Sequence, residues 1–168
     1  MELKLILAIC CFILSLSILT FAPILIGAPF EPTKNKELKS ITEIKKIPKN
    51  KKIVDLGSGN GKIIIAFAEK GYESHGYEIN PWLVLLTKYR IWRKGLRGKA
   101  FVHFGNFWTK NLSNFDVVIL FQIYYIMPRL EKKIKREMKK GSIVISNKWE
   151  FPTLKSDKKI GNVRIYNI

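Results

Sequence analysis

A glycine-rich turn between a short apolar stretch and a helical stretch constrains this chain more than any other feature. Residues 53–56 read Ile-Val-Asp-Leu, and Gly57, Gly59 and Gly61 follow at alternate positions before a helical run. Glycines let the backbone approach a ligand closely, and the free N–H groups at a helix start face an anionic or polar group. A second strand is expected to end near Glu78, 21 residues after Gly57, where a carboxylate meets ribose hydroxyls in nucleotide-binding folds. Together these features predict a βαβ unit that binds a nucleotide-like cofactor.

The spacing of the glycines favours one cofactor over another. The dinucleotide fingerprint is G-x-G-x-x-G, whereas this chain has G-x-G-x-G, with Asp55 two residues before the first glycine. This pattern resembles the E/D-x-G-x-G-x-G motif of class I methyltransferases. The predicted cofactor is therefore S-adenosylmethionine rather than NAD, and the alternative is a strand-to-helix connection that binds no ligand.

Strand and helix signals alternate along the rest of the chain, which predicts an α/β fold with a Rossmann-like, doubly wound and mostly parallel sheet. The expected strands are 52–56, 73–77, 100–103, 115–121, 142–146 and 162–166, and helices are expected to begin near Gly61, Pro81 and Pro128. We expect the last strand to lie antiparallel at the sheet edge. The chain looks too short for a full C-terminal hairpin.

An apolar run near the N-terminus predicts a membrane anchor. Leu5–Ala28 holds 24 residues without a charge, and about 20 such residues span a bilayer as a helix. A cleaved signal peptide would have a shorter apolar core and an A-x-A-like site, which Gly27–Pro29 does not offer. Lysines are more frequent after the run than before it. The positive-inside tendency then predicts a single-pass membrane protein with its catalytic domain in the cytoplasm.

These signals divide the chain into three parts. Residues 1–30 are the predicted transmembrane anchor, and residues 51–168 are the predicted methyltransferase domain. Residues 31–50 form a membrane-proximal segment between them, in which apolar residues recur at helical spacing over 35–47. We expect this amphipathic helix to close over the cofactor edge of the domain.

Charge and cysteine content narrow the function. The net charge is +17, and three interpretations remain open: an A/T-rich coding sequence, contact with anionic lipid, and RNA binding. The two cysteines, Cys10 and Cys11, both lie in the apolar run. This excludes a cysteine nucleophile and a cysteine-based zinc site in residues 31–168. No metal site is predicted, because His75 and His103 lie on expected strands without a partner carboxylate at ligand spacing.

Several motifs resemble the small membrane-anchored protein-lysine methyltransferases, whose mitochondrial members methylate the c-subunit of ATP synthase or the adenine nucleotide translocase. The motifs are P-F-E-P-T at 29–33, V-D-L-G-S-G-N-G-K at 54–62, G-Y-E-I-N-P at 76–81, D-V-V-I-L-F at 116–121 and L-E-K-K-I at 130–134. The resemblance implies S-adenosylmethionine as cofactor and a lysine of a membrane or membrane-adjacent protein as substrate. Asn60 and Asn106 stand where the family usually has aspartate, and residues 121–125 replace its Gly-Val-Pro turn.

The resemblance and the turn chemistry together assign a role to each cofactor-binding candidate. Three glycines frame the methionine portion, Asp55 faces the cofactor amino group, Glu78 takes the ribose hydroxyls, and Asn106 with Phe107 meets the adenine. The alternatives are a capping role for Asp55, a solvated strand-end acid at Glu78 and an ordinary turn at Asn106, and Asn80 is interpreted first as a helix cap. The complete set is Asp55, Gly57, Ser58, Gly59, Gly61, Glu78, Asn80, Asn106 and Phe107.

No residue stands out as a general base. The catalytic candidates are Glu31 and Thr33, if their segment folds over the site as the resemblance implies, and Tyr124, which with Tyr125 is also a candidate for the substrate channel. Two other functions stay open. An RNA methyltransferase would suit the charge, although the chain lacks the N/D-P-P-Y signature of amino-group methylases of nucleic acids. A non-catalytic, cofactor-binding membrane protein would suit the asparagine replacements.

Overall fold

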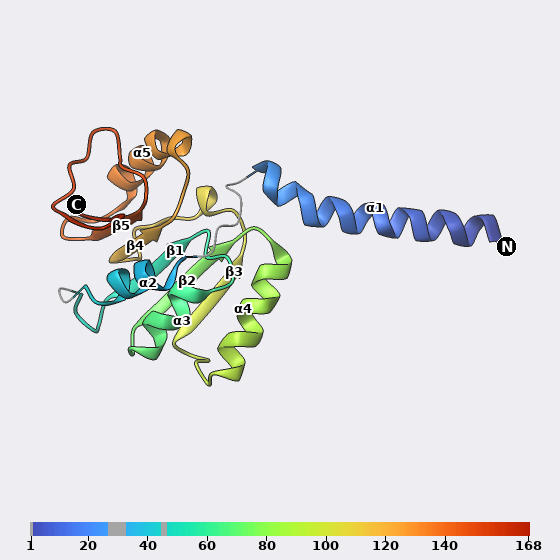
Figure 1. Cartoon of the computed structure of the whole chain (residues 1–168), viewed down its shortest axis with the longest axis horizontal. Coiled ribbons are helices and arrows are strands. Elements are labelled where there is room, and N and C mark those ends of the chain that lie inside the picture. Colours follow the sequence, from blue (N-terminus) through green and yellow to red (C-terminus); the bar gives the residue numbers. More distant parts are fainter. Residues whose placement is uncertain (1, 27–32, 45–46) are drawn as a thin grey trace.

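A seven-stranded sheet organises the described part of the chain, which in this computed structural model comprises residues 2–26, 33–44 and 47–168 (Figure 1). The strand order is β3-β2-β1-β4-β5-β7-β6. The strands are β1 (Lys52–Leu56), β2 (Glu73–Glu78), β3 (Ala100–Phe104), β4 (Val117–Leu120), β5 (Ile143–Asn147), β6 (Lys158–Ile160) and β7 (Val163–Asn167).

The first five strands run parallel, as the alternation of strand and helix signals predicts. β4 is apolar and buried along its whole length, as a strand covered on both faces should be. The register sets Leu56 of β1 beside Tyr77 of β2 and Leu120 of β4. The loops that follow the parallel strands therefore meet at one edge of the sheet.

Helices cover both faces of this sheet. They are α2 (Asn35–Thr42), α3 (Lys62–Glu69), α4 (Pro81–Arg93) and α5 (Met127–Glu137), with 3₁₀ turns η1 (Phe107–Thr109) and η2 (Tyr124–Ile126). Ile53 of β1 packs with Ile41 and Phe67 from α2 and α3, whereas Val54 packs with Leu130 from α5. Successive strand residues point to opposite faces, so α5 lies across the sheet from α2 and α3 (Figure 1).

The C-terminal end of the chain forms a hairpin, so the expectation that the chain is too short for one is wrong. β7 pairs antiparallel with β5, as expected, but it also pairs with β6, so β6 and not the last strand lies at the sheet edge. Ile160 pairs with Val163, which leaves a two-residue turn, and Gly161 in that turn has φ 60°. The sequence does not indicate β6 because this strand has only three residues and begins with two lysines. Lysines are typical of an exposed sheet edge.

The predicted membrane anchor is not supported. α1 (Glu2–Ile26) covers most of the apolar run (Figure 1), but none of the described helices is long and apolar enough to cross a membrane. The prediction of a transmembrane helix at residues 1–30 is therefore wrong. The predictions that depend on it, single-pass membrane localisation and a cytoplasmic catalytic domain, are wrong as well.

α2 is shorter than the helical spacing over residues 35–47 suggests, because it ends at Thr42. Ile41 and Ile47 are nevertheless both buried in the cluster on the α3 face of the sheet. Lys62, the first residue of α3, donates from Nζ to the carbonyl oxygen of Thr33 (2.6 Å) and to Oδ1 of Asn35 (2.8 Å). The start of this segment therefore lies against the residue that follows the glycine turn.

Candidate functional site

The glycine turn has a backbone that favours glycine at three positions. Gly57, Gly59 and Gly61 have φ angles of 81°, 54° and 75°, in the left-handed region that L side chains rarely adopt. The N–H groups of Gly57 and Ser58 both donate to the carbonyl oxygen of Tyr77 on β2, at 2.9 and 3.0 Å. The turn is thus held to the end of the neighbouring strand.

Close neighbours also exclude side chains from this turn. A Cβ at Gly61 would lie 2.3 Å from Cγ2 of Thr87 on α4, and a Cβ at Gly57 would lie 2.9 Å from Nε2 of Gln122. Thr87 Oγ1 donates to the carbonyl oxygen of Gly59 at 3.2 Å. Side chains of α4 and of the segment after β4 therefore pack against the turn.

Glu78 ends β2 and joins the glycine turn to the start of α4. Its side chain is buried, Oε2 accepts from the N–H of Gly59 at 2.7 Å, and Oε1 accepts from the N–H of Asn80 at 2.8 Å. Hydrogen bonds from two backbone N–H groups fix the carboxylate in one orientation. The predicted ribose-binding acid therefore lies beside the predicted glycine turn.

Asp55 is a buried acid two residues before the turn. Burial, with a smaller contribution from the nearby charge of Glu78, raises the pKa of Asp55 to about 8. A carboxyl group with this pKa is mostly protonated at neutral pH, and a cation placed beside it would favour its ionised form. The surroundings of Asp55 thus suit a positively charged group such as an amino group.

Ser58 contributes an unpaired hydroxyl group. Among the described residues its Oγ is buried and has no hydrogen-bond partner. A Cβ at Gly76 would lie 2.5 Å from this oxygen, so the strand residue facing Ser58 has no space for a side chain. The Ser58 hydroxyl group therefore packs directly against β2.

The two predicted asparagine contacts act as caps. Asn80 Oδ1 accepts from the N–H groups of Trp82 (3.0 Å) and Leu83 (3.4 Å) and so caps α4, as the capping alternative predicts. Asn106 Oδ1 accepts from the N–H of Trp108 at 3.0 Å and caps η1. Asn106 and Phe107 follow β3, next to β2 in the sheet, so they lie at the same edge as Glu78.

Three supporting contacts had no clear signal in the sequence. Gln122 Nε2 donates to the carbonyl oxygen of Leu56 at 2.6 Å, directly before the turn, and Gln122 is buried. Arg90 of α4 donates to the carbonyl oxygen of Asn60 at 3.1 Å. The third is the Thr87 hydrogen bond described above. Each acts on a backbone oxygen from a distant segment, so no local motif reveals it.

The structure describes two of the three catalytic candidates. Glu31 lies outside the described residues, with residues 29–32 of its motif. Thr33 is buried, and its carbonyl oxygen accepts from Lys62. Tyr124 is 65% exposed and follows β4 at the edge where the glycine turn lies.

Tyr124 belongs to a cluster of three aromatic rings. Its centroid lies 5.6 Å from that of Tyr125 and 5.6 Å from that of Trp149. Trp149 follows β5, and Leu120 of β4 pairs with Ser146 of β5, so both segments leave the sheet at the same edge. Sequence reasoning named both tyrosines as channel candidates but did not include Trp149.

The two histidines lie elsewhere on the sheet. His75 Nδ1 is 3.1 Å from His103 Nε2, and His75 Nε2 is 3.0 Å from Oε1 of Glu73, so a carboxylate does neighbour this pair. Burial, followed by the charge of His75, lowers the pKa of His103. No group of three His, Cys, Asp or Glu residues in the described ranges is arranged to hold a metal ion.

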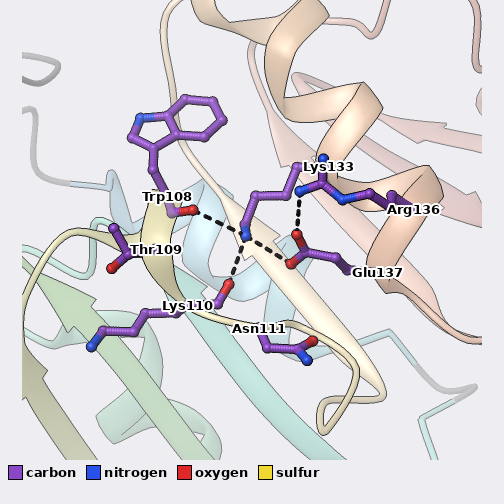
Figure 2. A pocket seen from close by; sticks show the side chains of 7 residues that line it. All are labelled: Trp108, Thr109, Lys110, Asn111, Lys133, Arg136 and Glu137. Atoms are coloured by element: carbon purple, nitrogen blue, oxygen red, sulfur yellow. Dashed lines mark hydrogen bonds and ion pairs between the residues drawn. The ribbon is translucent and has the colours of Figure 1, made fainter.

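A cavity of about 440 Å³ lies between the η1 segment and α5 (Figure 2). Lys133 is its central residue, and dashed lines in Figure 2 join the Lys133 ammonium to two backbone carbonyl groups and to Glu137. The full lining is Trp108, Thr109, Lys110, Asn111, Lys133, Arg136 and Glu137. The cavity adjoins the segment that carries Asn106, but the glycine turn does not line it.

The chain matches known methyltransferases in sequence. Residues 55–158 match the family described as the ANTKMT methyltransferase domain. The human lysine N-methyltransferase of the ATP synthase c-subunit is 37% identical over 124 residues, covering 74% of this chain and 53% of that protein. A protein-lysine N-methyltransferase of Saccharolobus islandicus (strain REY15A) is 32% identical over 125 residues, covering 73% of this chain and 78% of that protein.

Solved structures share the fold. The crystal structure of an RNA methyltransferase from Salinibacter ruber, in complex with S-adenosyl-L-homocysteine, has a TM-score of 0.74 and 22% sequence identity. The match covers 81% of this chain and 91% of that one. At this identity the likeness establishes the class I methyltransferase fold alone. The chain spans about half the length of the human relative it matches.

Proposed function

Because this chain belongs to the ANTKMT methyltransferase family, we propose that it transfers a methyl group from S-adenosylmethionine to a lysine side chain of a protein. The observation that carries the proposal is the junction at Glu78, where one buried carboxylate holds both the glycine turn and the start of α4. The named activities of the human and archaeal relatives support the substrate class.

The residues present at the sheet edge fit this cofactor. Asp55 would receive the cofactor amino group, since a cation relieves the unfavourable charge of its buried carboxylate. Gly57, Gly59 and Gly61 would lie along the methionine portion, and Ser58 offers a hydroxyl group without a partner. Glu78 would receive the ribose hydroxyls, with Asn80 beside it. Asn106 and Phe107 would contact the adenine from the end of β3.

The cofactor supplies an electrophilic methyl group when bound, and the chain must supply a neutral, positioned lysine amine. Catalysis of such a displacement depends mainly on positioning and on removal of water. Tyr124, Tyr125 and Trp149 would form the walls that receive the lysine side chain, because aromatic faces attract an ammonium group and shield it from water. An apolar surrounding also lowers the pKa of a lysine amine, which helps it lose its proton.

The candidates for the proton acceptor are Tyr124 and Thr33. Tyr124 is itself one of the aromatic walls, whereas the backbone carbonyl oxygen of Thr33 accepts from Lys62. We assign the activity to residues 51–168, with residues 31–50 contributing Thr33 and the packing of α2 against the sheet. No role is assigned to Glu31.

Transfer of label tests the proposal. The protein would be incubated with methyl-tritiated S-adenosylmethionine and an extract of its own cells, with Glu78→Ala as the blank, and the products would be digested with protease or with nuclease. Label released by protease and recovered as methyl-lysine is the expected result. Nuclease-sensitive label would favour RNA methylation instead, and cofactor binding without any label would favour a non-catalytic protein.

A further inference from the structure

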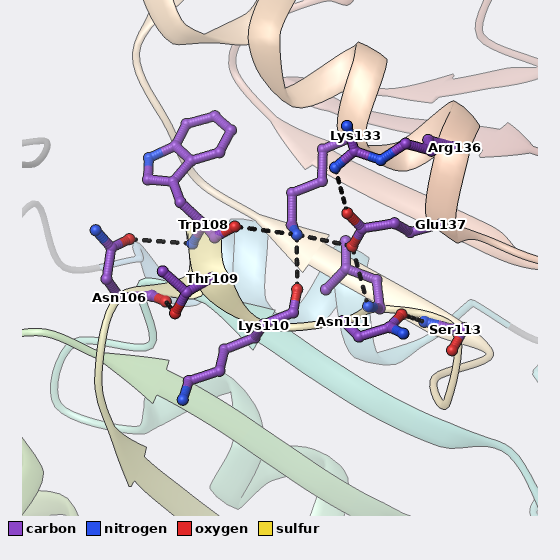
Figure 3. Close-up of polar contacts among 10 residues, drawn as sticks. Asn106, Trp108, Thr109, Lys110, Asn111, Ser113, Lys133, Arg136 and Glu137 are labelled. Carbon is purple, nitrogen blue, oxygen red and sulfur yellow. Dashed lines mark hydrogen bonds and ion pairs between the residues drawn. The ribbon is translucent and has the colours of Figure 1, made fainter.

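Lys133 is a buried lysine whose ammonium group reaches from α5 to an irregular segment of the chain. Its side chain is 5% exposed. Nζ donates to the carbonyl oxygen of Lys110 at 2.6 Å and to that of Trp108 at 3.3 Å, and to Oε2 of Glu137 at 2.7 Å (Figure 3). An ammonium group has three donors, so each of them has an acceptor here.

Glu137 holds the same segment from the next turn of α5. Its Oε2 accepts from the N–H of Leu112 at 3.2 Å, and Oε1 accepts from Arg136 at 2.6 Å. Burial opposes ionisation of this carboxyl group, but the hydrogen bonds from Lys133, Arg136 and Leu112 lower its pKa below the usual value. The Lys133–Glu137 ion pair therefore binds both kinds of backbone group: Lys133 donates to carbonyl oxygens, and Glu137 accepts from an N–H.

The segment that this pair holds begins at the predicted adenine contacts. Residues 106–112 connect β3 toward β4, and η1 is their only regular element. Asn106 Oδ1 accepts from the N–H of Trp108, whose carbonyl oxygen accepts from Lys133. The Trp108 ring is also covered by the guanidinium group of Arg129, 4.3 Å from the ring centroid. A continuous set of contacts thus leads from α5 to Asn106 (Figure 3).

We propose that Lys133, together with Glu137, is a positioning pair that fixes residues 106–112 and thereby the cofactor contacts of Asn106 and Phe107. This inference rests on the proposed function. Burying two charged groups is costly, and an apolar pair of similar volume would fill the same space without that cost. The pair instead satisfies backbone groups that have no strand partner. Lys133 does not touch the cofactor in this arrangement, so it acts through the segment.

The test compares Lys133→Met with Lys132→Met in the full chain. Lys132 is the exposed neighbour of Lys133 on α5, so its change is the matched control. We expect Lys133→Met to weaken binding of S-adenosylhomocysteine about tenfold, the loss that corresponds to one ordinary hydrogen bond. The KM for S-adenosylmethionine should rise by a similar factor while kcat at saturating cofactor stays within about twofold. Lys132→Met should match the wild type.

Hydrogen exchange separates a positioning role from a purely structural one. Amide protons of residues 107–112 should exchange about tenfold faster in Lys133→Met, while those of β1 and β4 stay protected. A merely structural residue would lower the amount of folded protein but leave the affinity of the folded fraction unchanged, and that outcome would overturn the proposal. Glu137→Gln keeps an acceptor oxygen and serves as the milder variant if Lys133→Met does not fold. Its affinity for S-adenosylhomocysteine should be lower than that of the wild type by less than tenfold, and wild-type affinity would count against the pair.

The wild-type protein distinguishes failure of this inference from failure of the proposed function. If the wild type does not bind S-adenosylhomocysteine, the proposed function is wrong. If amide hydrogen exchange in residues 107–112 is also unchanged in Lys133→Met, the role of Lys133 in fixing the segment is refuted as well. If the wild type binds it and Lys133→Met binds it equally well, the inference alone is wrong.

Discussion

The N–H of Gly59 donates to Oε2 of Glu78 at 2.7 Å, which joins the turn after the first strand to the end of the second. The other oxygen of the buried carboxylate, Oε1, accepts from the N–H of Asn80. The acid that the sequence singles out for a ligand therefore also supports the turn. Substitutions at this position should affect both stability and binding.

Replacement of Glu78 by alanine leaves two backbone donors without an acceptor. Each unsatisfied donor costs about 1–3 kcal/mol, so Glu78→Ala should lower the melting temperature measurably and abolish binding of S-adenosylhomocysteine in calorimetry. Glu78→Gln keeps one acceptor oxygen and should be more stable than Glu78→Ala, with weakened binding. Glu69→Ala is the control, because Glu69 makes only an exposed pair with Lys94. Unchanged affinity in Glu78→Ala would refute the ribose assignment.

Cofactor affinity should depend on pH through Asp55. Its pKa is about 8 in the folded protein and 3.8 ordinarily, so the folded protein holds a proton between these values that the unfolded chain releases. The stability contributed by the protonated group is complete below about pH 4 and declines as pH rises through 8. A ligand amino group needs the ionised carboxylate. Affinity for S-adenosylhomocysteine should therefore rise by up to about tenfold per pH unit from pH 6 and level off near pH 8.

Asp55→Asn provides the control for this pH dependence. The amide has the same shape but does not ionise over this range, so its affinity should be lower at pH 8 and nearly independent of pH between 6 and 8. Calorimetry in two buffers of different ionisation enthalpy should show release of about one proton on binding to the wild type at pH 7. An identical pH profile in both proteins would assign the titration to another group.

Gly61 should be intolerant of a methyl group for two separable reasons. Its φ is 75°, and a Cβ there would lie 2.3 Å from Cγ2 of Thr87. Gly141 has φ 81° with no atom within 4 Å of the same position, so Gly141→Ala reports the backbone cost alone, about 1–2 kcal/mol. Gly61→Ala should cost about 1–3 kcal/mol more than that in chemical denaturation.

Thr87→Ser identifies the source of this additional cost. It removes Cγ2 and keeps the hydroxyl group that donates to Gly59. The double variant Gly61→Ala/Thr87→Ser should regain part of the lost free energy of unfolding. Simple addition of the two single effects would show that the clash with Cγ2 of Thr87 is not the cause.

Substitutions in the aromatic cluster should lower kcat/KM for the protein substrate and leave the affinity for the cofactor unchanged. Tyr124→Ala and Trp149→Ala each remove a ring from a contacting pair whose centroids lie 5.6 Å apart. Loss of a cation–aromatic contact of about 1 kcal/mol should lower kcat/KM for the protein substrate roughly five- to tenfold. Affinity for S-adenosylhomocysteine should remain unchanged. Tyr89→Ala, an exposed aromatic residue on α4, is the control, and an equal effect there would remove the argument for the cluster.

Much of the fold follows from local sequence signals. The strand at 52–56 and the start of α4 after Asn80-Pro81 agree with the structure, because burial period and helix caps are properties of adjacent residues. Failures occurred where those signals are weak or ambiguous. β6 is three residues long with two lysines, and the apolar run at Leu5–Ala28 predicted an anchor that the described helices do not support.

By itself, the sequence determined the class of fold and the family, since strand, glycine turn, helix and acid occur in a fixed order within residues 53–78. Tertiary structure decided which distant groups complete the site. Gln122 meets the carbonyl oxygen of Leu56, and Lys133 meets that of Lys110, across 66 and 23 residues of chain. In these contacts a polar side chain donates to a backbone carbonyl oxygen. Every residue has such an oxygen, so the sequence does not mark which one accepts. Only the folded chain shows which side chain reaches it.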